Sequence, residues 1–364
     1  MAKERGRARW ALAAVCWVLA APVWASHENA ETILGQWDKW ASRRQQVEPA
    51  PQPRPLESAA SAPPALITAA QSAASGVMAL MVLDKGTVVF ETYSQGATAA
   101  SRLNAYSMTK SMTALAVGEA LCAGKIHSLD DAAKTYAPVL AGTAYGEATV
   151  RQLLAYTSGA QDPGGDGYAG IHDGRDFGAV LRWQLSLVDL MKKYGEIRAK
   201  PGERFVYNGL NSEALSLVVR GATDMPLASW FGQTVWRKAG AELSAGWFAD
   251  RDGNSLAEVA FLATTRDYAR VGLYVLERLT GQSADTCMNA FVKEAATPVA
   301  RKAYWKAAPQ FGLGLHVGAD GNTWIMGHGG QRIGINARSG RVVVSNGAWD
   351  WRELDDALQR LLAY

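Results

Sequence analysis

A serine and a lysine three positions apart could form a nucleophile and its base. Ser107 and Lys110 form the only S-x-x-K of the chain. The apolar pattern after them predicts a helix over 108–121, and residues three apart share one helix face. Burial would lower the pKa of the amine, and a neutral amine can take the proton of a neighbouring hydroxyl. The same segment also fits a helix N-cap followed by a surface lysine, so other segments must decide.

Three later segments favour the catalytic interpretation. They read L-x-x-x-T-S-G over 153–159, P-G-x-x-F-x-Y over 201–207, and Gly-His-Gly-Gly-Gln over 327–331. With the S-x-x-K they stand in an order and at spacings that resemble the serine β-lactamase and penicillin-binding superfamily. Within it, the chain is most similar to the class C-like branch, which includes esterases and 6-aminohexanoate-dimer hydrolases. The likeness runs from about residue 76 to residue 349.

The resemblance implies a role for each matching residue. Ser107 matches the nucleophile that becomes acylated, and Lys110 matches its base. Tyr207 matches the tyrosine that passes a proton to the leaving group and helps to activate the deacylating water. The backbone N–H groups of Ser107 and Gln331 would form the oxyanion hole, in which the loss of one donor typically costs about 10²–10³ in rate.

The second motif departs from the family pattern. It usually reads Y-x-N, whereas this chain has Tyr207, Asn208 and Gly209. Asn208, a candidate substrate contact, therefore stands one position early.

The third motif also departs from its usual K-T-G. Here it reads His328, Gly329 and Gly330, of which the two glycines match the strand that lines the pocket. A lysine charge helps to hold the carboxylate of a β-lactam or a D-Ala-D-Ala peptide, whereas a histidine carries little charge at pH 7. We therefore expect a neutral ester or amide substrate, contacted by His328. A histidine that is only hydrogen-bonded at a strand end remains the alternative.

The order of predicted elements indicates an α+β fold. Strands are expected near both ends of the chain, and helices between them, which predicts one antiparallel sheet built from both ends, flanked by helices, with an all-helical lobe inserted. The β-lactamase/transpeptidase-like fold implied by the resemblance has this arrangement. The expected strands span 78–83, 87–93, 312–317, 323–328, 332–336 and 341–345, and the expected helices span 108–121, 176–194, 211–222, 265–279 and 351–362.

The N-terminal region predicts export. Residues 1–25 combine a basic start with an apolar run over 10–23, which is short for a membrane span and typical of a signal peptide. An uncleaved anchor is the alternative. Residues 26–65 predict a short helix over 31–44 and a linker with six prolines over 49–64, and residues 66–364 form the hydrolase domain. We expect a periplasmic or secreted protein without stable membrane insertion after cleavage.

Composition excludes several other classes of function. The net charge of +3 equals the charge of residues 1–25, so the remainder is neutral and gives no electrostatic case for nucleic acid. No Cys/His cluster has zinc spacing, and we expect neither metal nor cofactor. Cys122 and Cys287 lie in apolar helical patterns, and the sequence leaves open whether they pair.

The sequence thus predicts a secreted serine hydrolase that cleaves small esters or amides through a Ser107 acyl-enzyme. Two alternatives stay open. One is a β-lactamase or D,D-peptidase, and the other is a penicillin-binding-like module without turnover.

Overall fold

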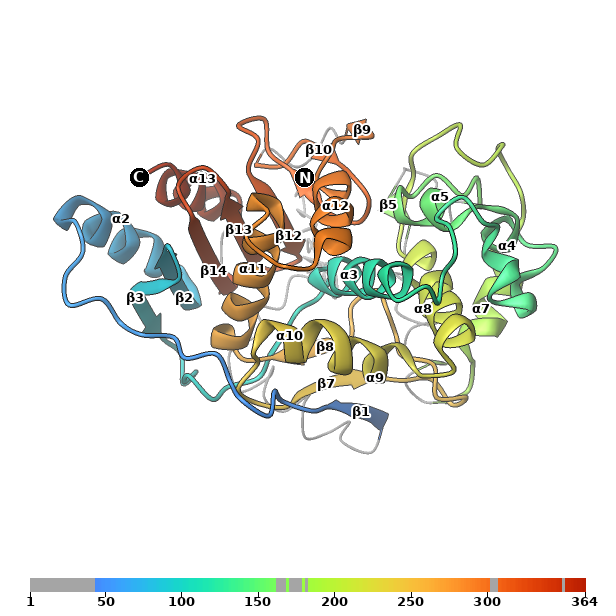
Figure 1. Ribbon diagram of the computed structural model, residues 1–364, viewed down its shortest axis with the longest axis horizontal. Helices are drawn as coiled ribbons and strands as arrows, with labels where there is room; N and C mark the ends of the chain where they lie inside the picture. The colour runs from blue at the N-terminus through green and yellow to red at the C-terminus, as the bar shows by residue number, and fades with distance from the viewer. Residues whose placement is uncertain (1–42, 162–167, 170–178, 181–182, 302–306, 349–350) are drawn as a thin grey trace, which may run out of the picture.

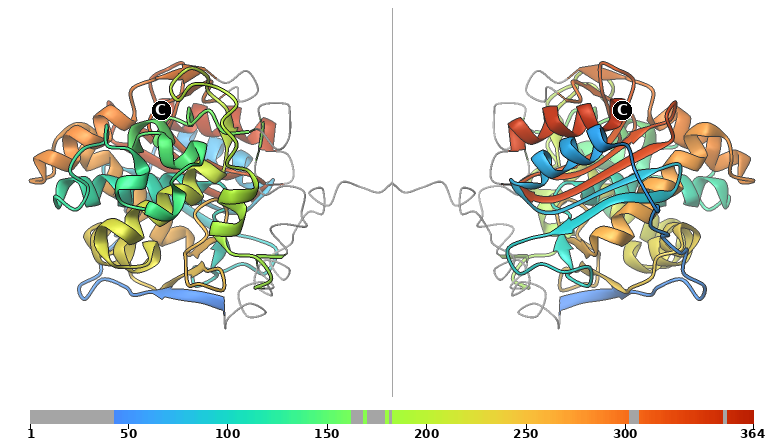
Figure 2. Two further views of the ribbon diagram at one scale, coloured as in Figure 1. Left: turned by 90° about the vertical axis from the view of Figure 1, so that its right-hand side faces the viewer. Right: turned by 90° about the vertical axis from the view of Figure 1, so that its left-hand side faces the viewer.

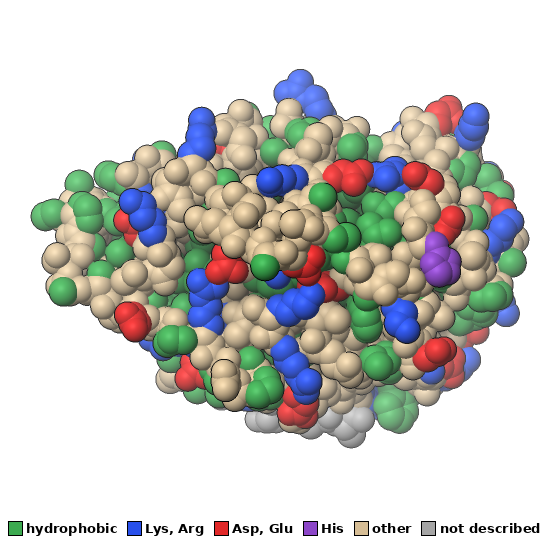
Figure 3. Space-filling model, in the orientation of Figure 1, with side chains coloured by type: hydrophobic (Ala, Val, Ile, Leu, Met, Phe, Trp, Pro, Cys, Tyr) green, Lys and Arg blue, Asp and Glu red, His purple; other side chains and the backbone are tan. Residues whose placement is uncertain are grey.

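The computed structural model describes residues 43–161, 168–169, 179–180, 183–301, 307–348 and 351–364 (Figure 1). The predicted signal peptide and most of the predicted helix over 31–44 lie outside these residues. Within the described part of the chain, no helix is both long and apolar enough to cross a bilayer. Acidic and basic side chains are interspersed over the face of the molecule in Figure 3.

An eight-stranded antiparallel sheet joins the two ends of the chain, as predicted. Strand β14, from the C-terminal region, pairs along its length with β2, from the N-terminal region. The α+β, β-lactamase/transpeptidase-like fold is thereby confirmed. The strand order is β3 (Thr87–Tyr93), β2 (Val77–Asp84), β14 (Arg341–Ala348), β13 (Gln331–Asn336), β12 (Thr323–Gly327), β11 (His316–Val317), β10 (Gln310–Phe311) and β9 (Ala300–Arg301).

The sheet is covered on both faces, which explains the unbroken apolar run of β2. Successive side chains of a strand point to opposite faces. Leu80 and Val82 pack into the core under helices α2 (Pro64–Ala74) and α13 (Trp351–Ala363). Met81 and Leu83 pack into the larger core, on the side of α11 (Thr265–Thr280). Figure 2 shows α2 and α13 lying together on the outer face.

The helical lobe and a smaller sheet complete the body. Helix α3 (Met108–Cys122) runs through the centre and contacts both α8 (Leu210–Thr223) and β12 (Figure 1). The smaller sheet has the order β1 (Arg44–Val47), β7 (Ala245–Phe248), β8 (Phe261–Ala263) and β4 (Leu103–Asn104). The remaining lobe helices include α4 (Ala144–Glu147), α5 (Val150–Leu154), α7 (Leu187–Lys193), α9 (Leu227–Phe231), α10 (Arg237–Ala239) and α12 (Thr286–Ala295).

The proline-rich segment follows the surface of the body. Its chain is held by backbone hydrogen bonds from Ala50 to Ala241 and from Arg54 to Gly240, both 2.8 Å. Strand β1 precedes it and adds an edge to the smaller sheet through β7.

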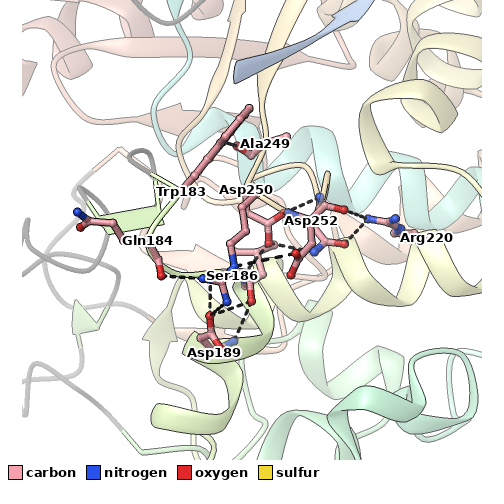
Figure 4. A network of polar contacts seen from close by, with 11 residues as sticks. Trp183, Gln184, Ser186, Asp189, Arg220, Ala249, Asp250 and Asp252 are labelled. Carbon is pink, nitrogen blue, oxygen red and sulfur yellow. Dashed lines mark hydrogen bonds and ion pairs between the residues drawn. The ribbon is translucent and has the colours of Figure 1, made fainter. Parts of the chain in front are cut away.

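The unbroken helix predicted over 176–194 is wrong. Residues 179–180 and Leu187–Lys193 are helical, but residues 183–186 between them are not. Ser186 and Asp189 form a capping box that starts α7 there. The carboxylate of Asp250 also accepts the Leu187 N–H at 2.7 Å, and Arg251 pairs with Asp189 at 2.8 Å (Figure 4). A polar network from a neighbouring loop therefore fixes the start of the helix.

The single strand predicted over 312–317 is also wrong. The chain turns between β10 and β11, and Gly314 adopts a left-handed φ of +80°. A Cβ at Gly314 would lie 2.4 Å from the Cβ of Ala114, and Ser111 Oγ donates a 2.7 Å hydrogen bond to the Gly314 carbonyl. The strand is interrupted because this turn packs directly on α3.

Candidate active site

Ser107 stands at the entrance of α3, where the smaller sheet holds the preceding chain. The preceding strand β4 pairs with β8, and the N–H of Ala105 donates to the Phe261 carbonyl at 2.8 Å. Tyr106 has a φ of +44°, which is strained for a bulky residue, and its N–H is held by the Asn104 side chain at 2.9 Å. This turn places the Ser107 side chain at the positive end of the α3 dipole, in a nearly buried position.

Lys110 lies one turn further along α3, in contact with Ser107. Its Nζ is 3.0 Å from Ser107 Oγ and donates a 3.1 Å hydrogen bond to the Glu258 carbonyl oxygen. Its side chain is only 4% exposed. Burial lowers the pKa of Lys110 from its usual value, and the negative charges of Glu258 and Glu213 partly offset this effect. The arrangement therefore has the geometry of a hydroxyl beside an amine that loses its proton easily.

Tyr207 joins Ser107 and Lys110 from a different element, the strand β6 (Tyr207–Asn208). It begins this short strand, is 2% exposed, and packs its ring against Tyr156 and Phe311. Lys110 Nζ lies 5.5 Å from the centre of the Tyr207 ring. The structure thus brings the three predicted residues from α3 and β6 into one buried cluster.

Asn208 lies beside this cluster but is bonded within the helical lobe. Its Nδ2 donates to Tyr145 Oη at 3.1 Å and to the Gln161 carbonyl at 3.3 Å, and its Oδ1 accepts the Leu210 N–H at 2.9 Å. These bonds hold β6 and the start of α8, so the observed contacts of Asn208 are structural.

The turn between β12 and β13 borders Ser107. A Cβ on Gly327 would lie 2.3 Å from the Ala105 carbonyl oxygen and 3.2 Å from the Met108 nitrogen. This close approach brings the turn, which contains His328, Gly329 and Gly330, to the entrance of α3. His328 is exposed, and its ring centre lies 6.0 Å from that of Tyr106.

Gln331 is held by its side chain at the start of β13. Its Oε1 accepts hydrogen bonds from Asn346 Nδ2 at 2.8 Å and from the Gly347 N–H at 3.2 Å. The carbonyl of Gly330 accepts a 2.7 Å bond from Ser345 Oγ. Strand β14 therefore holds the chain on which the second expected oxyanion donor lies.

Sequence reasoning missed two buried glutamates next to Lys110. Glu258 Oε1 lies 3.4 Å from Lys110 Nζ, and Glu213 accepts the N–H groups of Ala257 at 2.7 Å and of Glu258 at 3.0 Å. Burial first, and the charge of Glu258 second, raise the pKa of Glu213 to about 8. The available signal was an acidic residue inside each of two apolar segments, where a charge requires a partner.

Residues 65–363 match the model of the family described as Beta-lactamase. The chain belongs to the beta-lactamase family. Its catalogued relatives are named as hydrolases, and the resemblance inferred from the four motifs is confirmed.

The chain is similar to a 6-aminohexanoate-dimer hydrolase and to several solved hydrolase structures. The chain is 25% identical over 287 residues to the 6-aminohexanoate-dimer hydrolase of Paenarthrobacter ureafaciens, which covers 74% of this chain and 72% of the relative. A Bacillus anthracis structure described as a "putative 6-aminohexanoate-dimer hydrolase" has a TM-score of 0.73 at 19% identity and covers 91% of this chain and 93% of that one. The hydrolase EstCE1, which has promiscuous acyltransferase activity, has a TM-score of 0.63 at 16% identity, covering 80% and 97%.

Proposed function

We propose that this family member is an exported serine hydrolase that cleaves ester or amide bonds through an acyl-enzyme on Ser107. The observation that carries the proposal is the 3.0 Å contact between Lys110 Nζ and Ser107 Oγ, both of which are buried. In the neutral state, the amine can accept the hydroxyl proton while Oγ attacks the substrate carbonyl.

The remaining steps follow from the neighbours of this pair. The oxyanion that forms on the carbonyl oxygen would accept hydrogen bonds from the N–H groups of Ser107 and Gln331. Tyr207 would pass a proton to the leaving alcohol or amine, so that the acyl-enzyme forms and the leaving group departs neutral. The proton that Lys110 took from Ser107 would pass to Tyr207 and restore its hydroxyl. A water molecule would then attack the acyl carbon and give a proton to the Lys110 and Tyr207 group, which returns a proton to Ser107 Oγ as the Oγ–carbon bond breaks and the acid leaves.

The third motif supports a substrate without an essential carboxylate. The family's lysine is replaced by His328, which is exposed beside Tyr106. This substitution removes a fixed positive charge from the turn beside Ser107, which disfavours β-lactams and D-Ala-D-Ala peptides relative to neutral esters and amides.

A disulfide supports the proposal of export. Cys122 at the end of α3 is bonded to Cys287 in α12, at a sequence separation of 165. Disulfides persist mainly in oxidising compartments, such as the periplasm or the exterior of the cell. The predicted signal peptide points to the same destination.

A fluorophosphonate probe tests the nucleophile directly. We expect stoichiometric labelling of the wild-type protein and no labelling of Ser107→Ala, with both proteins folded by circular dichroism. Labelling at another residue, or none in folded wild type, would contradict the proposal. Turnover rates on three substrates then distinguish the activities: p-nitrophenyl esters for an esterase, a 6-aminohexanoate dimer for an amidase, and nitrocefin for a β-lactamase. A burst of product without further turnover would indicate a binding module.

A further inference from the structure

Gly209 takes the position at which the family's second motif has asparagine, and a neighbouring side chain fills the space that it leaves. A Cβ on Gly209 would lie 2.1 Å from the carboxyl carbon of Glu258 and 2.2 Å from its Oε1. The backbone of Gly209 has φ −60° and ψ −23°, which any residue can adopt. Glycine here therefore leaves the space that the carboxyl group of Glu258 occupies, and the backbone conformation does not require it.

The same carboxyl group faces the catalytic lysine. Glu258 Oε1 is 3.4 Å from Lys110 Nζ, and the Glu258 carbonyl oxygen accepts a hydrogen bond from that amine at 3.1 Å. The Glu258 side chain is 1% exposed. One residue thus contacts Lys110 through both its backbone and its side chain, in a buried position where solvent screens charge only weakly.

Glu213 holds Glu258 in this place. It lies four residues after Gly209, on the same face of α8, and its two carboxylate oxygens accept the N–H groups of Ala257 and Glu258. Helix α8 therefore supplies both the gap for the Glu258 carboxyl group and the anchor for its backbone.

We propose that Glu258 is a positioning residue for Lys110. Its carboxyl group takes the place of the missing motif asparagine and stabilises the protonated amine that forms when Ser107 is acylated. This inference rests on the proposed function. In the acylation step the proton of Ser107 Oγ moves to Lys110 Nζ as the Oγ–carbon bond forms, and the new positive charge then lies next to the Glu258 carboxyl group.

The groups that face Lys110 define the expected pH dependence. They are Ser107, the Tyr207 ring, Glu258 and, through its charge, Glu213. A negative charge on Glu258 favours the protonated amine, so its removal should shift the acidic limb of the acylation rate to lower pH. The plateau rate should also fall, because the protonated amine is less stable in the transition state.

The test is the stopped-flow burst of p-nitrophenyl acetate, measured from pH 5 to pH 10 with Glu258→Gln. We expect a plateau about 10- to 100-fold lower and an acidic limb shifted down by at least half a pH unit. The matched control is Glu119→Gln. Glu119 is another buried glutamate, on α3, but its carboxyl group pairs with Lys238 and Tyr274 and not with Lys110. It should change thermal stability and leave the limb in place.

A rescue experiment keeps the inference testable if Glu258→Gln folds poorly. Glu258→Ala vacates the space beside Gly209, and adding Gly209→Asn restores the family's Y-x-N motif. We expect the double variant to be acylated at least ten times faster than Glu258→Ala.

The outcomes separate the two proposals. Wild type that is not acylated at Ser107 overturns the proposed function itself. Acylation at Ser107 with an unchanged plateau and limb in Glu258→Gln, or a double variant no faster than Glu258→Ala, overturns the role of Glu258 while the serine hydrolase stands.

Discussion

Replacing Lys110 with methionine should remove the base and keep the shape of the site. Methionine is unbranched and apolar, so it suits a position that is 4% exposed. The amine stands 3.0 Å from Ser107 Oγ, within reach for direct proton transfer. A positioned general base typically contributes about 10²–10⁴-fold, which corresponds to about 3–5 kcal/mol of barrier. We expect the acylation rate of Lys110→Met to fall by that factor.

The pH profile of the wild type gives the second half of this prediction. A lysine with an ordinary pKa would be neutral in roughly one molecule in 1,000 at pH 7.5, and its rate would rise tenfold per pH unit up to about pH 10. Burial lowers the pKa of Lys110, so the rise of the acylation rate with pH should level off below pH 10.5, the ordinary pKa of a lysine.

The assay is the burst amplitude and rate with p-nitrophenyl acetate, for wild type, Lys110→Met and the surface control Lys238→Met. Lys238 is 41% exposed and pairs with Glu119 and Asp285, so its loss should leave the burst unchanged. A Lys110→Met burst within about threefold of wild type, or a wild-type rate that climbs tenfold per unit to pH 10, would refute the assignment of the base.

Three further predictions concern stability and the pocket turn. Replacing Cys122 and Cys287 with serine should lower the unfolding free energy by up to about 5 kcal/mol, which is the loop entropy expected for a disulfide at a sequence separation of 165. Urea unfolding measures this loss, and an unchanged unfolding midpoint would contradict it. Because the folded pKa of Glu213 is raised to about 8 from 4.5, its favourable contribution to stability is present below pH 4.5 and is lost as pH rises to about 8. The stability of Glu213→Gln relative to wild type should therefore improve across that window in unfolding titrations, and a pH-independent difference would argue against the raised pKa. Asp355→Asn should lower the unfolding free energy by about 3–5 kcal/mol, since it breaks a 2.7 Å buried pair with Arg332. Arg332 also donates to the Gln331 carbonyl, so kcat should fall together with stability. Full activity in a destabilised variant would show that other contacts hold the turn.

Local patterns were enough to predict most of the sheet and the long helices. The strand predicted over 87–93 is β3, and the helix predicted over 265–279 is α11 within one residue. These segments have a clear period and clear ends, so their local preference and their tertiary environment agree. The segments over 176–194 and 312–317 differ because long-range contacts decide them. The Asp250 loop fixes the start of α7 at Leu187, and the strand over 312–317 is interrupted where the turn at Gly314 packs on α3.

The candidate site was predictable only where its residues lie in motifs. Ser107 and Lys110 are one helical turn apart, and Tyr207 belongs to a recognisable segment. Glu258 lies 148 residues from Lys110 and has no motif around it. Its position depends on the backbone hydrogen bonds that Glu213 accepts, and such pairing across the fold leaves no local pattern in the sequence.

The two departures from the family motifs have separate steric causes. Gly209 leaves room for a carboxyl group, as a Cβ there would lie 2.1 Å from Glu258. Gly329 and Gly330 have φ values of +67° and +76°, a region that threonine adopts only with strain. A single His328→Lys substitution would therefore add a charge to a turn of different shape, and it would not recreate the carboxylate site of a K-T-G strand. Each departure is coupled to its neighbours, so the specificity of this chain depends on how those neighbours pack as well as on the residue that changed.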